Sequence, residues 1–80
     1  MVSPTVLRAG GFRFYFFSRE ETRMHVHVYH AHGEAKFWME PEIELAHNHG
    51  LSGRRIASAA RLIRRYENEI RGAWKAHFGR

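Results

Sequence analysis

The sequence contains no cysteine, which excludes disulfide bonds and any zinc site that needs a thiolate ligand. It also lacks an apolar run of about 20 residues, so no segment is predicted to cross a membrane. Met1–Pro4 is too short and too polar for a signal peptide, and we expect a cytoplasmic protein. The 80 residues predict a single domain, residues 1–80, whose small core favours association, either as a homodimer or with a partner.

The sequence likewise has no glycine-rich phosphate loop, no nucleophile elbow and no His-Glu-x-x-His helix. These absences exclude the commonest enzyme classes, leave open whether the protein is an enzyme, and predict no cofactor. What the chain does have is positive charge, with 13 Lys and Arg against 8 Asp and Glu, and 7 histidines. A net charge of +5 favours nucleic acid or an acidic protein as a partner.

The first predicted hairpin turns at Gly10-Gly11, because a glycine pair suits a two-residue hairpin turn. The flanking runs, Thr5–Arg8 and Phe12–Ser18, are rich in β-branched and aromatic residues and predict two strands. The turn sets which residues lie opposite each other. The expected pairs are Ala9 with Phe12, Leu7 with Phe14 and Thr5 with Phe16 on an apolar face, and Arg8 with Arg13 on a cationic face.

A second hairpin is predicted from strict alternation of polar and apolar residues in His25–His30 and Glu34–Glu40. A two-residue turn at His32-Gly33 keeps the two faces chemically distinct. The expected pairs are Val28 with Phe37 and Val26 with Met39 on one face, and His27 with Trp38 and His25 with Glu40 on the other. Pro41 ends the second strand, and Ile43–Ala46 forms either a short fifth strand or a helical turn.

From Ser52, a predicted N-cap, the pattern becomes helical over Arg54–Phe78. One side of this helix is apolar and the opposite side is basic, and Gly72 on the basic side is expected to let the last turns bend or fray. Glu67 falls within the apolar stripe, so it requires either an Arg or His partner on the sheet or an edge position open to solvent. The predicted fold is α+β, with an antiparallel sheet of four to five strands built from two hairpins and packed by one long C-terminal helix.

Two histidines, His25 and His27, share one strand face about 7 Å apart, a spacing that suits a shared metal or phosphate. With Glu40 they form a weak candidate metal site, although half-exposed sheet histidines commonly bind nothing. For ribonuclease chemistry, a histidine base, a cation and a stacking ring are needed. His25, His27 and Lys36 are the candidate catalytic residues, with Trp38 as the stacking ring, but these residue types also coincide by chance on a basic sheet.

The candidate binding residues are mostly cationic. His47 and His49 precede the helix N-terminus, where backbone N–H groups attract phosphate, although both also suit an ordinary turn. The helix arginines suit phosphate contacts, or else a solvated face that keeps the protein soluble. The full candidate set comprises Arg13, Trp38, His47, His49, Arg54, Arg61, Arg64, Arg65 and Arg71.

Several motifs together resemble a small bacterial family catalogued as domain of unknown function 4160. They are Pro4–Arg8, Gly10–Phe14, His25–Val28, Glu34–Trp38 and Asn48–Gly50, and the likeness extends to Trp74 and Phe78. The resemblance implies a predicted toxin–antitoxin-like pair of bacterial cytoplasmic proteins, in which the partner is a small protein encoded nearby. It brings no established catalytic residues, and this chain departs from the family in the arginine content of its helix.

The leading functional hypothesis is therefore a toxin–antitoxin-type module that binds RNA or DNA phosphates and a cognate acidic protein. The alternatives are a non-enzymatic protein interaction module, a histidine-based ribonuclease and a histidine-ligated metal-binding protein.

Overall fold

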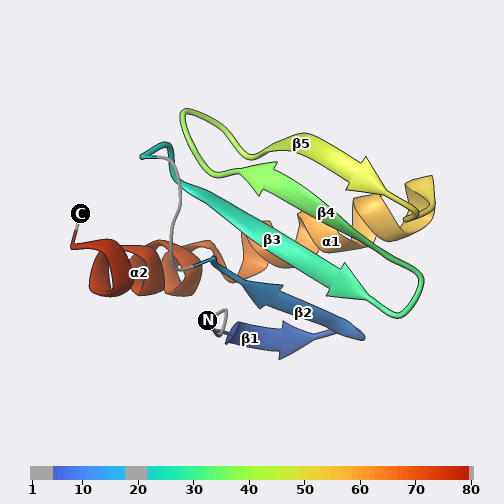
Figure 1. The fold of residues 1–80 in the computed structure, drawn as a ribbon, viewed down its shortest axis with the longest axis horizontal. Coiled ribbons are helices and arrows are strands. Elements are labelled where there is room, and N and C mark those ends of the chain that lie inside the picture. Colours follow the sequence, from blue (N-terminus) through green and yellow to red (C-terminus); the bar gives the residue numbers. More distant parts are fainter. Residues whose placement is uncertain (1–4, 18–21, 80) are drawn as a thin grey trace.

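The computed structural model describes residues 5–17 and 22–79 and shows a five-stranded antiparallel sheet followed by two helices. The strands are β1 (Thr5–Ala9), β2 (Phe12–Tyr15), β3 (His25–His30), β4 (Gly33–Trp38) and β5 (Glu44–His49), and they lie in the sheet in chain order. The helix α1 (Gly53–Arg65) crosses behind the sheet, and α2 (Glu67–Phe78) continues past the ends of β2 and β3 (Figure 1). The predicted α+β class is confirmed, with a fifth strand beyond the two hairpins and two helices in place of one.

The first hairpin has the predicted turn, because Gly10 and Gly11 both adopt positive φ, at 57° and 81°. Its register matches the prediction at Ala9–Phe12, Arg8–Arg13 and Leu7–Phe14. An irregularity between Thr5 and Leu7 then pairs Thr5 with Tyr15, so the expected Thr5–Phe16 pair is wrong. Strand β2 ends at Tyr15, and Ser18, where the strand was predicted to end, lies outside the described residues.

The second hairpin turns at Ala31-His32, two residues from the predicted register, because His30 pairs with Gly33. The observed pairs are Val26 with Phe37, Val28 with Ala35, His27 with Lys36 and His25 with Trp38. A shift of two residues leaves every side chain on its predicted face while it changes every partner. Gly33 is needed for close packing rather than for the turn, since an added Cβ would lie 2.4 Å from the His49 carbonyl oxygen.

Strand β5 covers Glu44–His49, so His47 and His49 are strand residues and the predicted turn at these positions is wrong. The pairing of β5 with β4 contains a β-bulge: Phe37 faces Leu45, whereas Lys36 faces His47, which leaves Ala46 as the extra residue. The turn after β5 is held by Asn48, whose side chain donates to the Leu51 carbonyl at 2.9 Å and accepts from the Leu51 N–H at 3.0 Å.

The helix begins as predicted, because the Ser52 hydroxyl accepts a hydrogen bond from the Arg55 N–H at 3.2 Å. The helical segment is interrupted at Tyr66, whose φ of −105° and ψ of 22° separate α1 from α2. The Tyr66 N–H still donates to the Leu62 carbonyl and the Tyr66 carbonyl accepts from Ile70, so the chain bends without losing these bonds. The bend therefore occurs at Tyr66 and not at Gly72, which lies inside α2.

The core fills the space between the sheet and the helices. Its fully buried members come from every layer: Phe14, Phe16, Val26, Val28, Phe37, Met39, Ala59, Ile63, Ile70 and Trp74. Glu67 lies at the edge of this core and accepts a 2.7 Å hydrogen bond from Arg71, so the edge position was the correct alternative. Arg71 also donates to the Met39 carbonyl at 2.6 Å, and this bond ties α2 to the end of β4.

No helix of the described chain is long and apolar enough to span a membrane.

Candidate functional site

The face of the sheet away from the helices carries polar and aromatic side chains in ordered rows. Because residues that pair across antiparallel strands point to the same face, the register places four of them side by side. We call them the central row, and they run from β2 to β5: Tyr15, His27, Lys36 and His47. The neighbouring row on the same face comprises Arg13, Tyr29, Glu34 and His49.

A hollow of about 200 Å³ opens on this face over the central row. We call it the sheet hollow, and its lining residues are Tyr15, Phe17, His27, Glu34, Ala35, Lys36, His47 and His49. The volume is smaller than the roughly 300–1,000 Å³ of pockets for drug-sized ligands. The sheet hollow therefore suits one planar ring or one phosphate group rather than a whole cofactor.

Aromatic rings form one wall of the sheet hollow. Tyr15 stacks on His27 with ring centroids 5.3 Å apart, and the Phe17 ring lies 4.4 Å from the same imidazole. Phe17 is 43% exposed, and Tyr29 in the neighbouring row is 49% exposed. Large exposed rings on one face offer planar surfaces for ligands that stack.

Cations lie over the rings of this face. The Lys36 Nζ is 4.4 Å from the centroid of Trp38, and the guanidinium carbon of Arg23 is 4.1 Å from it. Arg13 lies 4.5 Å from the Tyr15 centroid and donates from Nε to the Thr5 hydroxyl at 2.7 Å. Cation–π contacts hold these charges beside the aromatic surface, where phosphates and bases of one strand could be bound together.

His25, predicted to share the exposed face with His27, is fully buried. Its Nδ1 donates a hydrogen bond to the Arg23 carbonyl oxygen at 2.7 Å. The centroid of its ring lies 5.1 Å from that of Trp74 and 5.8 Å from that of Trp38. The His25 ring is therefore covered by its neighbours, although its pairing with Trp38 keeps it on the side of the sheet predicted for it. It contacts His27 at 5.2 Å between ring centroids and so packs beside an imidazole that lines the sheet hollow.

The candidate metal set of His25, His27 and Glu40 is not assembled. His25 faces Trp38 rather than Glu40, whose carboxylate accepts a 3.3 Å hydrogen bond from the Met24 N–H. Among residues 5–17 and 22–79, no group of three or more His, Asp or Glu residues is placed to hold a metal ion.

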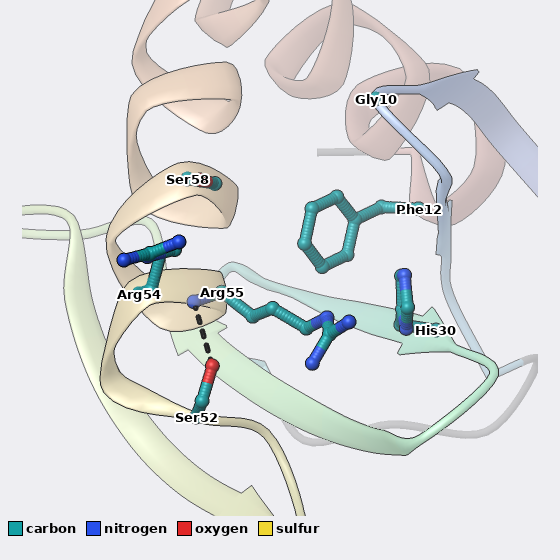
Figure 2. A pocket seen from close by; sticks show the side chains of 7 residues that line it. All are labelled: Gly10, Phe12, His30, Ser52, Arg54, Arg55 and Ser58. Carbon is teal, nitrogen blue, oxygen red and sulfur yellow. Dashed lines mark hydrogen bonds between the residues drawn. The ribbon is translucent and has the colours of Figure 1, made fainter.

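A second, basic hollow of about 480 Å³ lies on the helix side, between the N-terminus of α1 and the turns of both hairpins. Figure 2 shows the Arg55 side chain extending from α1 toward Phe12 and His30. The pKa of His30 is lowered from its ordinary value of 6.5, first by burial and then by the positive charges of Arg55 and His32. The His32 N–H donates to Nδ1 of His30 at 3.4 Å, a bond that needs this nitrogen unprotonated.

We expect replacement of Arg55 with glutamine to raise the pKa of His30, because a nearby positive charge is removed. Titration of the His30 ring signals by NMR measures this change, and Arg54→Gln is the matched control. Since folding lowers this pKa, the unfolded chain binds the proton more tightly, and acidification below about pH 6.5 favours unfolding through His30. A His30 pKa at or above 6.5 in the wild-type protein would contradict the prediction.

The predicted arginines of the helices do not lie beside the sheet hollow. Arg61, Arg64 and Arg65 are exposed on α1, which covers the opposite face of the sheet (Figure 1), and Arg54 lines the second hollow. Arg71 is partly buried and bonded to Glu67 and Met39. The two cationic surfaces predicted from the sequence therefore lie on opposite sides of the molecule.

Sequence reasoning missed Tyr15, Phe17 and Tyr29 as members of the site. Their positions follow from the same alternation that predicted the cationic face: Tyr15 and Phe17 continue the series begun by Arg13, and Tyr29 continues the series of His25 and His27. The period of two therefore places these three rings on the same face as His27 and Lys36.

Searches of curated proteins and of solved structures find no significant match to this chain. The model of one protein family, described as Domain of unknown function (DUF4160), matches residues 11–75, which include both hairpins from Gly11 onward and the helices as far as Lys75. The protein therefore belongs to the DUF4160 family.

Proposed function

We propose that the protein binds single-stranded nucleic acid on the open face of the sheet, with one base or phosphate in the sheet hollow. The observation that carries this proposal is the central row, in which Tyr15 and three basic side chains lie side by side on a face that the helices do not cover. Stacking of a base on an aromatic side chain contributes about 1–3 kcal/mol and tolerates any base. Lysine and arginine beside the rings can bind the phosphates between the bases.

A single strand fits this face better than a duplex does. The rings of Phe17 and Tyr29 are exposed and available for stacking, whereas the bases of a duplex are stacked on each other. The net charge of +5 adds a long-range attraction for any nucleic acid, so the aromatic rings are what should favour unpaired strands.

The proposal extends to the toxin–antitoxin role that the family resemblance implies. The exposed arginines of α1, among them Arg61, Arg64 and Arg65, suit an acidic partner protein. Because α1 lies on the other side of the sheet, such a partner and a nucleic acid strand could bind at the same time. Co-expression with the neighbouring gene product, followed by size-exclusion chromatography, tests for this complex.

The binding test is fluorescence anisotropy with labelled single-stranded RNA, single-stranded DNA and duplex DNA of mixed sequence at low salt. Phe17→Ala is expected to weaken single-strand binding by about 5- to 150-fold, which corresponds to the 1–3 kcal/mol of one stacked base. Lys36→Gln should weaken binding to every strand and reduce by about one the slope of log affinity against log salt.

Arg61→Gln on α1 is the matched control, because it removes the same charge from the opposite side of the molecule. It should weaken binding less than Lys36→Gln does. Equal losses of affinity in Arg61→Gln and Lys36→Gln would show that binding depends only on net charge, which would contradict the proposed site. The absence of any binding at low salt would contradict the proposed function itself.

A further inference from the structure

We propose that the sheet hollow cleaves RNA, with His27 and His47 as general base and general acid and Lys36 as the cation on the scissile phosphate. This inference rests on the proposed binding of single strands to the same face, and it assigns RNA as the substrate class. It is carried by three side chains that the strand register brings together: His27 in β3, Lys36 in β4 and His47 in β5.

The order of these three residues fits in-line displacement at phosphorus. His27 and His47 each lie directly opposite Lys36, and all three line the sheet hollow. Directly opposed residues have Cβ atoms about 4.5–5.5 Å apart, so the histidines flank Lys36 with about 10 Å between their Cβ atoms. In-line attack places the entering and leaving oxygens on opposite sides of phosphorus. A base and an acid are therefore needed on opposite sides of the phosphate, and the central row provides them.

The reaction is a transphosphorylation that balances without a metal or a co-reactant. One imidazole, neutral, takes the proton of the ribose 2′-hydroxyl while the 2′-oxygen forms a bond to phosphorus. The bond from phosphorus to the 5′-oxygen breaks, and the other imidazole, protonated, gives its proton to that oxygen. The products are a 2′,3′-cyclic phosphate and a 5′-hydroxyl end, and the Lys36 ammonium balances the charge on the non-bridging oxygens.

The β-bulge in β5 brings His47 to this site. Without an extra residue at Ala46, strict alternation would place His47 on the same side as Leu45, which pairs with Phe37 of the core face. The bulge reverses the alternation, so His47 points with Lys36 to the open face. Bulges commonly re-aim side chains next to functional sites.

The other histidines do not offer an equivalent pair. His25 is fully buried, His77 lies on α2, and His30 and His32 stack on each other at the far end of β3 with 5.5 Å between ring centroids. His49 lies opposite Glu34, one row away from Lys36. Among the described residues, His27 and His47 are therefore the two imidazoles that flank a lysine.

The test is incubation of the full chain with a 5′-labelled single-stranded RNA in EDTA, analysed on a denaturing gel and by mass spectrometry of the ends. A DNA strand of the same sequence should be bound and left intact, because it has no 2′-hydroxyl. His27→Gln and His47→Gln should each reduce the cleavage rate by about 10²–10⁴-fold. His32→Gln, in the turn between β3 and β4 and outside the sheet hollow, is the matched control and should cleave as the wild type does. Loss of cleavage in His27→Gln purified in the same way would exclude a contaminating nuclease.

The pH dependence separates catalysis from a structural role. Cleavage should follow a bell-shaped profile between about pH 5 and 8, because one imidazole must be neutral while the other is protonated. His27→Gln and His47→Gln should each remove one limb of that profile. Products that end in a 3′-hydroxyl, or equal activity in His27→Gln and His32→Gln, would overturn the inference. RNA that is bound but never cleaved would overturn it and leave the binding function standing, whereas the absence of binding would remove both.

Discussion

Replacement of Trp74 with alanine is expected to lower the free energy of unfolding by about 3–5 kcal/mol, the usual cost of removing a large buried aromatic ring. Trp74 is 1% exposed and fills the space between α2 and the sheet. Its ring lies 4.2 Å from Phe78, 5.3 Å from Phe16 and 5.1 Å from His25, measured between centroids. The total free energy of unfolding of a small domain is only about 5–15 kcal/mol, so this substitution would remove much of the stability.

Urea denaturation followed by circular dichroism measures this loss. Lys75→Ala, at the exposed neighbouring position of α2, is the control and should change the free energy of unfolding by less than about 0.5 kcal/mol. The loss of free energy of unfolding for Trp74→Phe should lie between those of Trp74→Ala and Lys75→Ala, because phenylalanine keeps a ring and leaves a smaller cavity than alanine does. If Trp74→Ala lowered the free energy of unfolding by less than about 1 kcal/mol, this result would contradict the packing of Trp74 between α2 and the sheet.

The effect of Trp74 should extend to the candidate site through His25. The His25 ring contacts both Trp74 and His27, at 5.1 and 5.2 Å between centroids, so the core supports the imidazole that faces the sheet hollow. A change in the core can therefore alter the functional face without touching it.

Gly33→Ala is expected to destabilise the fold by about 1–3 kcal/mol, because the added methyl group overpacks a backbone contact. Its Cβ would lie 2.4 Å from the His49 carbonyl oxygen and 2.7 Å from the carbonyl carbon of Gly50. These are backbone atoms that cannot rotate away as a side chain can. The ends of β4 and β5 must therefore separate, which would also displace the paired Glu34 and His49.

Gly72→Ala is the matched control, since an added Cβ at this position meets nothing within 4 Å. In the interior of α2, alanine should stabilise the helix by about 0.5–1 kcal/mol. The two substitutions add the same methyl group and should change the midpoint of urea unfolding in opposite directions. A neutral result at Gly33 would contradict the close approach of β4 to the end of β5.

Local rules were enough for the features that depend on residues near each other in the chain. The turn at Gly10-Gly11 follows from the φ preference of glycine, and the cap at Ser52 follows from its hydroxyl and the first turn of α1. The faces of β3 and β4 follow from alternation, which is why His27, Lys36 and Trp38 were predicted on one face and are found there.

Local rules did not determine the features that depend on a distant partner. The turn at His32-Gly33 and the turn at Ala31-His32 give identical faces, so alternation could not distinguish them. With the turn at Ala31-His32, Gly33 packs closely against the end of β5. No residue near Gly33 in the sequence indicates this contact. The bend at Tyr66 and the burial of His25 against Trp74 likewise depend on how the helices meet the sheet.

The sequence by itself determined a basic α+β domain with a histidine-rich strand face, because composition and periodicity are properties of the chain alone. Only the tertiary structure decided that His27, Lys36 and His47 form one row. That row needs the two-residue shift between β3 and β4 and the extra residue Ala46 in β5. Both are outcomes of pairing between strands, where long-range packing selects among registers that local propensity leaves nearly equal.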